Sequence, residues 1–547
     1  MTSSRGILAL WAALLLPLIA LSLPQAQRTG DGEHYLLTAA AFAAHATPGV
    51  TIADLDEARG ALTKGAPAFR QHVMALRCRS NEPRTAAALA ADAGSDASDP
   101  ASCPSVRLDV GWTQGPDTPW YSVHFWTYPA LVAPFLWITG GLGLPAPRAF
   151  ALCNWALILA TLAYVAFAWR ATLLQKNVLA ALFLLSGTTY YAWWTCPEVF
   201  TAAMVLLALM LADDGRPDRA MLCAALASTQ NPPVLVLCGL LGCSWCWKLF
   251  STRREYGSFG SFARAHRATF AWVIAATLVA VTPPLFYLYT VGVPNPIIAA
   301  GCTDRSLIGL ARLQSIFLDP NIGVIAANPG LILGVASVLV ISAFGAASAR
   351  DPKALTRLGR TVFLLAAAAA MALPALITTN WNQGHSVLGR YAYWLSMPIA
   401  FAVASSFATL PRRTVHGIAA LVVGLQVAAV LHYGVWGKNA RSDYLVLKPA
   451  ARFLLRRFPQ FYNPIPEIFV ERLVHREGMP TADGPEARVF RFPEKGAPTK
   501  LLVPARWMRF LDPACKPIAV TPVEGDWVYV SLRAGEKCGV EVPAVAP

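Results

Sequence analysis

Long apolar runs separated by short polar segments dominate the chain between residues 6 and 435. An α-helix needs about 20 mainly apolar residues to cross the hydrocarbon core of a bilayer. Runs of this length, or close to it, occur at 6–23, 149–169, 177–192, 197–212, 219–232, 234–250, 268–291, 327–346, 361–377, 393–410 and 416–435. The pattern predicts an all-α polytopic membrane protein with about 11 to 13 transmembrane helices.

A shorter apolar stretch at 128–144 begins at Tyr128-Pro129 and ends in a glycine-rich segment. Cytoplasmic connections of membrane proteins carry an excess of Lys and Arg. With Arg5 inside, the eleven runs place every basic connection in the cytoplasm, and a further crossing at 128–144 would invert them. We therefore expect 128–144 to be an interfacial or half-inserted helix. The basic connections carry Arg170 and Lys176, then Arg253, Arg254, Arg264 and Arg267, then Arg350, Lys353, Arg357 and Arg360, then Arg412 and Arg413.

This topology predicts a transmembrane domain over 1–435 and two sizeable outer segments. The first run is longer than the apolar part of a usual signal peptide and lacks a clean cleavage motif, so we expect a retained helix. The first outer segment is a loop over 24–127. The second is the tail, 436–547, whose short apolar segments are broken by Pro and Gly and predict a small α/β or β-rich domain. In an oxidising compartment, we expect the disulfides Cys78–Cys103 in the loop and Cys515–Cys538 in the tail.

The composition agrees with a membrane protein. Hydrophobic residues make up 55% of the chain and charged residues 14%, and the mean hydropathy is +0.46. The net charge of +14 is explained by the basic connections on the cytoplasmic side. Since these connections explain the surplus of basic residues, we expect no nucleic-acid partner. No zinc-finger spacing, P-loop or dinucleotide fingerprint occurs.

The block from Thr29 to Leu36, directly after the first run, places two carboxylates and a histidine where a membrane surface begins. Asp31 and Glu33 could serve there as general base, metal ligand or partner of a cation. The same pair would also suit an acidic helix start, with Asp31 as the N-cap and Glu33 in the first turn. The block alone leaves both interpretations open.

Further polar residues are assigned to the same side of the membrane. His124 lies in an aromatic segment typical of an interface belt, and Glu198 begins an apolar run, where it complements the helix dipole or contacts a polar headgroup. Arg390 and Tyr391 are either a snorkelling pair at a helix end or a phosphate clamp, because a guanidinium binds phosphate with two hydrogen bonds. The other candidates in outer loops are Arg305, Asp319 and His385.

Five short motifs follow one another along the chain: Gly30-Asp31-Gly32-Glu33-His34-Tyr35-Leu36, Tyr121-Ser122-Val123-His124, Pro197-Glu198, Leu318-Asp319-Pro320-Asn321 and Gly389-Arg390-Tyr391. In this order they resemble the bacterial membrane glycosyltransferases of the GT-C superfamily, near the protein mannosyltransferase and aminoarabinose transferase branch. The resemblance covers residues 6–435 and leaves the tail outside. It implies a multi-pass protein of the bacterial inner membrane, embedded in its lipids. The outer loop and the C-terminal domain, which the topology places on the outer side, would then be periplasmic.

The resemblance also implies a reaction and its residues. The donor would be a polyprenyl-phosphate-linked sugar, and the acceptor a glycan, lipid or protein. Asp31 would be the catalytic base, beside Glu33, and some relatives need a divalent ion such as Mg²⁺ or Mn²⁺, for which Asp31 would be the ligand. The chain departs from the family pattern at Gly32 and at Thr229-Gln230-Asn231-Pro232, where many relatives carry a basic residue. The residues implied in substrate and donor binding are His34, Tyr35, His124, Glu198, Arg305, Asp319, His385, Arg390 and Tyr391, with Arg390 as first choice for the phosphate and Arg305 as second.

Two other function classes share these features. A flippase or transporter of lipid-linked sugars would have the same spans and outer loops, but would tolerate loss of Asp31 better than loss of residues along its path. A non-catalytic scaffold of the same fold, binding through the C-terminal domain, would lose the acidic block. The intact Asp31, Glu33 and His34 favour an enzyme over a scaffold.

Overall fold

The computed structural model describes residues 19, 31–57, 112–114, 119–256, 258–348, 351–381, 387–410, 412–433, 445–536 and 538–540. Three predictions lie outside the described residues: the first apolar run apart from Ile19, the Cys78–Cys103 pair, and His385.

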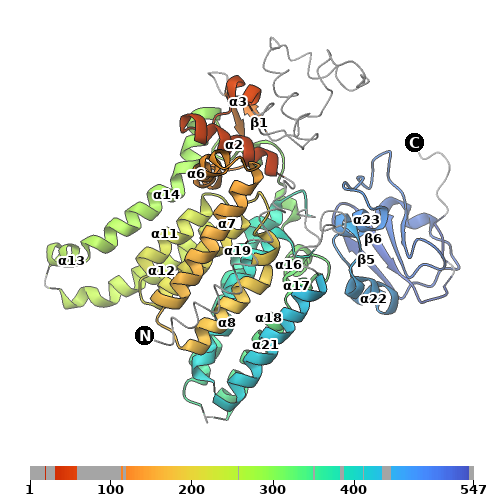
Figure 1. Ribbon diagram of the computed structural model, residues 1–547. Helices are drawn as coiled ribbons and strands as arrows, with labels where there is room; N and C mark the ends of the chain where they lie inside the picture. Colours follow the sequence, from red (N-terminus) through yellow and green to blue (C-terminus); the bar gives the residue numbers. More distant parts are fainter. Residues whose placement is uncertain are drawn as a thin grey trace.

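Long helices form one bundle, and a smaller domain lies beside it (Figure 1). The long helices are α7 (Pro147–Ala163), α8 (Leu173–Phe183), α10 (Glu198–Asp213), α11 (Pro217–Ser228), α12 (Leu235–Thr252), α14 (Arg267–Val291), α18 (Pro329–Ala347), α19 (Ala354–Ala372), α20 (Arg390–Ser406) and α21 (Arg412–Tyr433). Shorter helices connect them: α9 (Thr189–Tyr191), α13 (Phe259–Ala265), α15 (Pro296–Ala299), α16 (Leu310–Leu318) and α17 (Val324–Ala327). Helix α20 is buried along nearly its whole length, whereas α12 and α14 expose large apolar side chains.

Seven helices of the described residues are long and apolar enough to cross a membrane, in agreement with the predicted membrane class. They are Pro147–Ala168, Pro232–Thr252, Arg267–Val291, Pro329–Ala347, Ala354–Ile377, Arg390–Thr409 and Thr414–Tyr433, and each matches a predicted run. The predicted count of eleven crossings is not confirmed, because 177–192, 197–212 and 219–232 form shorter or interrupted helices. Helix α11, with 12 residues, is about 18 Å long at 1.5 Å per residue, less than a hydrocarbon core of about 30 Å.

The run 177–192 is interrupted at η4 (Leu184–Thr188), where Gly187 has φ +132°. Only glycine adopts this backbone conformation without strain. A Cβ at Gly187 would also overlap the ring of Tyr393 on α20. The hydroxyl groups of Tyr393 and Thr188 are hydrogen-bonded at 2.7 Å, so the break brings this segment against the central helix.

The two ends of the bundle are held by different sets of contacts. At one end Asp213 Oδ1 accepts a hydrogen bond from Arg360 at 2.8 Å, and Asp213 Oδ2 accepts one from Trp169 Nε1 at 3.0 Å. At the other end the Tyr128 amide donates to Gln230 Oε1 at 3.1 Å. The connections that carry Trp169, Asp213 and Arg360, all predicted to be on the cytoplasmic side, thus lie together at one end of the bundle. Tyr128 and Gln230, predicted to be on the outer side, lie together at the other end.

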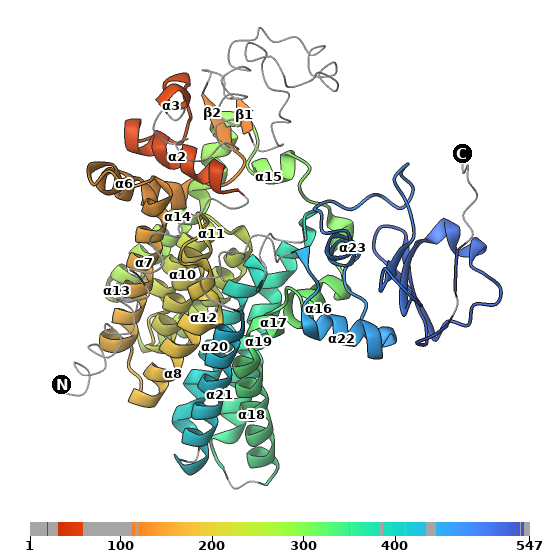
Figure 2. The same cartoon turned by 45° about the vertical axis from the view of Figure 1, so that its right-hand side comes forward.

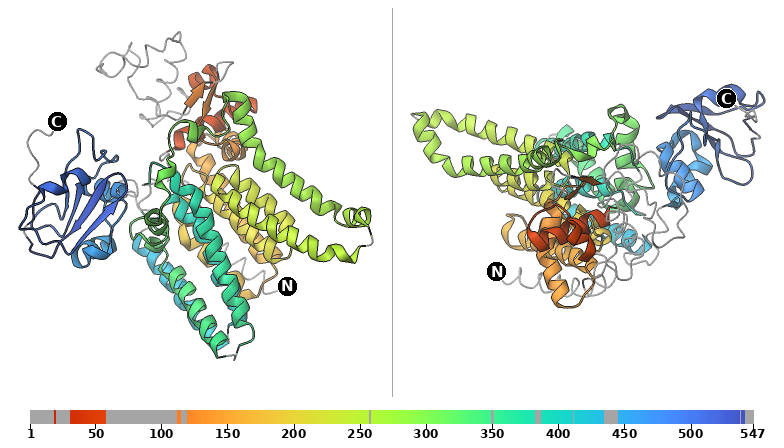
Figure 3. Two further views of the ribbon diagram at one scale, coloured as in Figure 1. Left: turned by 180° about the vertical axis from the view of Figure 1, so that it is seen from behind. Right: turned by 90° about the horizontal axis from the view of Figure 1, so that it is seen from above.

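Helices α2 (Gly32–His45) and α6 (Thr127–Gly141) lie together across that second end, as the side view and the view from above show (Figures 1 and 3). A short hairpin of β1 (Trp112–Gln114) and β2 (Trp120–Ser122) lies beside α2, as does α3 (Ile52–Glu57). Helix α6 has 15 residues and falls short of the length for a full crossing. Its predicted interfacial or half-inserted position stays a prediction.

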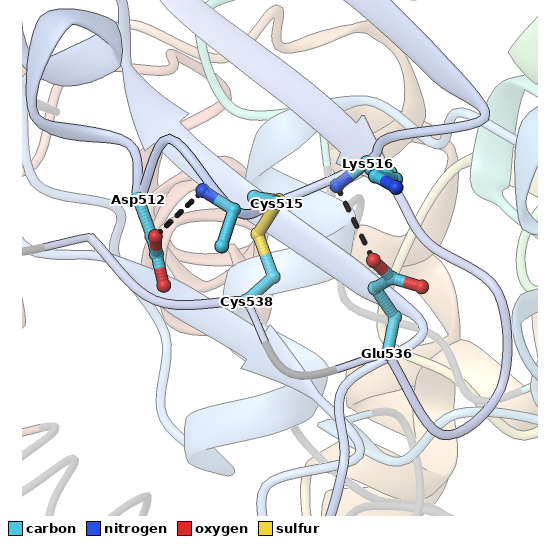
Figure 4. Close-up of a disulfide and its surroundings, with 6 residues drawn as sticks. Asp512, Cys515, Lys516, Glu536 and Cys538 are labelled. Carbon is cyan, nitrogen blue, oxygen red and sulfur yellow. Dashed lines mark hydrogen bonds between the residues drawn. A yellow bond between two sulfur atoms is a disulfide. The ribbon is translucent and has the colours of Figure 1, made fainter.

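The C-terminal domain contains a small antiparallel sheet with strand order β3-β4-β6-β5, which confirms the prediction of β structure in the tail. The strands are β3 (Phe490–Phe492), β4 (Lys500–Pro504), β5 (Ala519–Val523) and β6 (Trp527–Ser531). Helices α22 (Pro449–Arg457) and α23 (Pro466–Val474) and the 3₁₀-helices η11 (Pro459–Phe461) and η12 (Ala505–Phe510) complete the domain. The predicted disulfide Cys515–Cys538 is present (Figure 4).

Polar contacts join the C-terminal domain to the bundle at several points. Arg312 on α16 is 3% exposed and binds both carboxylate oxygens of Glu524, at 2.7 and 2.9 Å. The backbone amide of Trp381 donates to Glu467 on α23 at 2.9 Å. A planar guanidinium held by both carboxylate oxygens fixes orientation as well as distance, so the domain is docked on the bundle in one arrangement.

Candidate functional site

The carboxylate of Asp31 is held by two cationic or potentially cationic side chains. Asp31 occupies the N-cap position of α2, but its side chain makes no capping hydrogen bond. Its Oδ2 accepts a hydrogen bond from Arg390 Nη1 at 2.7 Å, and its Oδ1 lies 3.4 Å from His124 Nε2. Of the two interpretations of the acidic block, the capping role is therefore wrong for the Asp31 side chain.

Arg390 is placed by the segment that precedes it. It is the first residue of α20, and the amide of Gly389 before it donates to the carbonyl of Ile322 at 2.8 Å. The carbonyl of Leu388 accepts a hydrogen bond from the Tyr191 hydroxyl at 2.6 Å. These bonds fix the backbone at the start of α20, so the guanidinium reaches Asp31 from a supported position.

A second carboxylate, that of Glu198, lies on the other side of the guanidinium. Glu198 begins α10 and is 2% exposed, with Oε1 3.9 Å from Arg390 Nε. Among the described residues, Glu198 Oε2 and Arg390 Nε are buried and have no hydrogen-bond partner. Buried polar atoms are nearly always hydrogen-bonded, so this acceptor and this donor suit a ligand that supplies the missing bonds.

Both backbone polar groups of His124 form hydrogen bonds with side chains. Its amide donates to Ser122 Oγ at 3.0 Å, and its carbonyl accepts a hydrogen bond from the Tyr287 hydroxyl at 3.1 Å. The Ser122 hydroxyl also lies 3.3 Å from Nδ1 of His34, whose ring stacks on Trp112. The Tyr-Ser-x-His motif thus connects the hairpin, α2 and α14 around the imidazole that faces Asp31.

The surroundings determine the protonation of Asp31 and Tyr35. Burial alone would raise the pKa of Asp31, but the charges of His124 and Arg390 outweigh it and hold this pKa well below its ordinary value. Burial raises the pKa of Tyr35, whose ring lies 5.4 Å from that of His124, well above 10. Asp31 is therefore an ionised carboxylate next to a neutral phenol.

The other predicted site residues lie elsewhere or at the margin of this cluster. Glu33 lies in the first turn of α2, and Tyr391 follows Arg390 with its ring against Trp394. Arg305, in η7 (Arg305–Leu307), is exposed, and its side chain forms no hydrogen bond or ion pair with any described residue. Asp319 is buried at the junction with the C-terminal domain. The structure brings together Asp31, His34, Tyr35, His124, Glu198 and Arg390.

Sequence reasoning missed two residues that support the site. Gln230 Oε1 accepts the Tyr128 amide at the start of α6, and Asn231 Nδ2 donates to Thr201 Oγ1, one turn after Glu198, at 2.5 Å. Both belong to the segment noted as a departure from the family pattern. Two neighbouring side-chain amides between two apolar runs were the sequence signal that could have identified them. Where many relatives carry a basic residue, this chain has Gln230 and Asn231, which form these hydrogen bonds.

The donor set at Asp31 does not fit a divalent metal ion. Among the described residues, no three side chains of His, Cys, Asp or Glu gather in an arrangement that could hold one. Both oxygens of Asp31 are already engaged, by Arg390 and His124. The guanidinium with a free Nε suits an anion such as a phosphate better than the cluster suits Mg²⁺ or Mn²⁺.

Comparison of the chain with protein-family models, with curated proteins and with solved structures finds no match. A proposal for its function therefore rests on the geometry of the site and on the resemblance of its motifs.

Proposed function

We propose that this protein is a glycosyltransferase that moves a sugar from a polyprenyl-phosphate donor to an acceptor at the periplasmic face of a bacterial inner membrane. The supporting observation is the Asp31 carboxylate, which does not cap its helix and lies 2.7 Å from Arg390, with His124 and Glu198 beside the pair. A base and an anion-binding group are thus adjacent at one end of a bundle of apolar helices. In this proposal the eleven runs cross the membrane, and both 24–127 and 436–547 are periplasmic.

The reaction is a displacement at the anomeric carbon of the donor sugar. The acceptor oxygen forms a bond to this carbon while the bond from the carbon to the phosphate oxygen breaks. Asp31 accepts the proton of the acceptor hydroxyl as the oxygen attacks. Glu198 Oε2, which lacks a hydrogen-bond partner among the described residues, is suited to accept a hydroxyl of the sugar or of the acceptor.

Arg390 stabilises the leaving group. The polyprenyl phosphate gains negative charge as the sugar departs, and a guanidinium placed there stabilises the transition state more than the bound donor. Nε of Arg390 has no partner among the described residues and can donate to a phosphate oxygen without breaking an existing bond. The partly buried surroundings strengthen this interaction relative to water.

Donor binding and base strength are coupled through Arg390. In the free protein the pKa of Asp31 is held well below its ordinary value by His124 and Arg390, so the carboxylate is a weak base. A donor phosphate at Arg390 neutralises part of the positive charge that Asp31 feels. The pKa of Asp31 then rises, and the carboxylate becomes a stronger base when the donor is in place.

The experiment is a transfer assay with the full-length protein in nanodiscs. Polyprenyl phosphates carrying different sugars are supplied with inner-membrane lipid extract as the acceptor source, and free polyprenyl phosphate and glycosylated product are measured together. Equal amounts of both are expected for the active donor. Movement of the intact donor across proteoliposomes without its cleavage would support a flippase, and no change in any donor would support a scaffold.

A further inference from the structure

The C-terminal domain carries aromatic rings on its surface at one helical edge. Phe453 in α22 is 56% exposed, Phe458 directly after this helix is 43% exposed, and Phe461 in η11 is 79% exposed. Helix α22 buries Ala451 and Leu455 in the core of the domain. With 3.6 residues per turn, Phe453 lies on the opposite side of the helix from these two, so packing of the domain does not account for the ring.

Basic side chains accompany the rings. Arg452, Arg456 and Arg457 are exposed on the same helix as Phe453. The last two also line a cleft of about 820 Å³ together with Lys516 and Arg533, and Glu536 is the one acidic residue of its lining. A helix with aromatic and basic residues on its outward face is typical of segments that lie on anionic membrane surfaces.

Helix α22 begins where two candidate membrane spans end. Lys448, its N-cap, has its Nζ 5.0 Å from the ring centroid of Tyr433, the last residue of α21. The Lys448 amide donates to Asn321 Oδ1 at 3.0 Å, and Asn321 Nδ2 donates to the Tyr462 hydroxyl, directly after η11, at 2.7 Å. The Tyr433 hydroxyl donates to the carbonyl of Ala326, shortly before α18, at 2.9 Å.

The segment 448–462 is therefore tied at both ends to the point where α18 and α21 leave the bundle. Figures 1 and 2 show α22 at the edge of the domain nearest these two helices, and in Figure 2 its axis runs across theirs. An axis across the spans is parallel to the plane of a membrane that the spans cross.

We propose that the aromatic–basic surface, formed by Arg452, Phe453, Arg456, Arg457, Phe458 and Phe461, rests on the membrane surface. Its phenyl rings enter the boundary between headgroups and acyl chains, and its guanidinium groups bind the phosphates of anionic phospholipids. The lipid contact also supports the site, because Lys448 Nζ donates to the carbonyl of Val387, three residues before Arg390. Membrane contact thus holds both the domain and the start of α20.

Photocrosslinking of the full-length protein tests this proposal. The residue p-benzoylphenylalanine replaces Phe453 or Phe461, both exposed, so the fold tolerates it. The matched control replaces Arg509, exposed on η12, whose neighbour Trp507 packs on the face of the sheet opposite to α22. The variants are irradiated in nanodiscs of phosphatidylcholine alone or mixed with phosphatidylglycerol, and adducts are identified by mass spectrometry. Lipid adducts are expected at Phe453 and Phe461 and not at Arg509.

The role of the arginines in lipid selectivity is tested by changing Arg452, Arg456 and Arg457 to glutamine in the chain that carries the crosslinker at position 453. We expect the preference for phosphatidylglycerol adducts to fall at least roughly fivefold, the effect of one basic residue near an anionic surface. The matched control, Arg506→Gln with Arg509→Gln on the opposite face, should keep the preference. Absence of lipid adducts at both phenylalanines, or adducts to a second copy of the chain instead, would overturn the membrane contact. A preference that survives the triple change would overturn the role of the arginines.

Discussion

Arg390 Nη1 lies 2.7 Å from Asp31 Oδ2, although 359 positions separate the two residues. The side chains are 22% and 28% exposed. Ion pairs with this access to solvent add little to stability, about 0 to 1 kcal/mol. A small contribution to folding makes the pair suitable for substitution, because losses of activity can be separated from losses of structure.

Asp31→Asn should abolish transfer and leave the fold intact. The amide keeps the size of the side chain but cannot accept the acceptor proton, and a lost general base lowers rates by about 10²- to 10⁴-fold. Turnover of the purified variant in nanodiscs measures the effect, with Asp483→Asn, an exposed carboxylate of the C-terminal domain, as the control. Near wild-type turnover of Asp31→Asn would remove Asp31 from catalysis.

Arg390→Lys should lower turnover and weaken donor binding together. Lysine keeps the charge and could still snorkel, but it lacks the planar fork that binds a phosphate with two hydrogen bonds. Loss of one hydrogen bond to a charged group costs about 1.5 to 3 kcal/mol, or roughly 10- to 150-fold. Arg305→Lys, at an exposed arginine of another loop, is the matched control. Unchanged donor affinity in Arg390→Lys, with a loss in Arg305→Lys, would move the phosphate site to Arg305.

Arg390→Gln should move the acid limb of kcat/KM to higher pH. In the wild type the pKa of Asp31 is held well below 3.8 by His124 and Arg390, so Asp31 stays ionised through the neutral and mildly acidic range. Without the guanidinium, burial raises this pKa, and protonation of Asp31 reduces the residual activity at a higher pH. The pH profiles of Arg390→Gln and Arg305→Gln are compared. Coincident acid limbs in Arg390→Gln and the wild type would contradict the coupling.

The lowered pKa of Asp31 also determines how the contribution of the Asp31–Arg390 pair to the free energy of unfolding changes with pH. Because the folded pKa of Asp31 is below its unfolded value, the unfolded chain binds more protons between the two values. The free energy of unfolding therefore carries the contribution of the pair above the unfolded pKa, near 3.8, and loses it as the pH falls below.

Glu524→Gln should loosen the docking of the C-terminal domain. Arg312 is buried and keeps its hydrogen bonds to the carbonyls of Leu376 and Thr378, but it loses a charged partner, which costs about 1 to 3 kcal/mol. The amide of Trp381, bound to Glu467, reports on the junction, and its hydrogen exchange should accelerate several-fold. Glu486→Gln, an exposed glutamate of the same domain, should leave that exchange unchanged.

The sequence could place the ends of the helices but could not pair them. Alternating apolar runs and basic connections are local features, so they put Asp31, His124, Glu198 and Arg390 on one side. Which arginine binds Asp31 depends on packing across the bundle. The sequence analysis ranked Arg390 before Arg305, but only the position of α20 beside α2 shows that Arg390 reaches Asp31. Asp319 shows the reverse case: it sits in a family-like motif, yet its Oδ2 accepts a hydrogen bond from Tyr462 of the C-terminal domain, outside the resemblance.

The predicted number of crossings is not confirmed by the described helices, because hydropathy is a local property and does not show where a helix ends. The run 219–232 is apolar enough for a span, but its helix ends at Ser228, and Gln230 and Asn231 turn inward to hold Tyr128 and Thr201. Hydropathy includes Gln230 and Asn231 in the run. Their side chains, however, are placed by hydrogen bonds to Tyr128 and Thr201, which lie about 100 and 30 positions earlier in the chain.

The separation of Asp31 and Arg390 by 359 positions also determines when the pair can form during translation. At about 5 to 20 residues per second, the ribosome adds Arg390 roughly 20 to 70 s after Asp31. During that interval the Asp31 carboxylate has no Arg390 guanidinium to bind. Translation products that stop before α20 contain several apolar helices but lack Arg390. In the proposed function, a chain that ends before Arg390 is therefore inactive, and the Asp31–Arg390 pair can form only after more than two thirds of the 547 residues have been made.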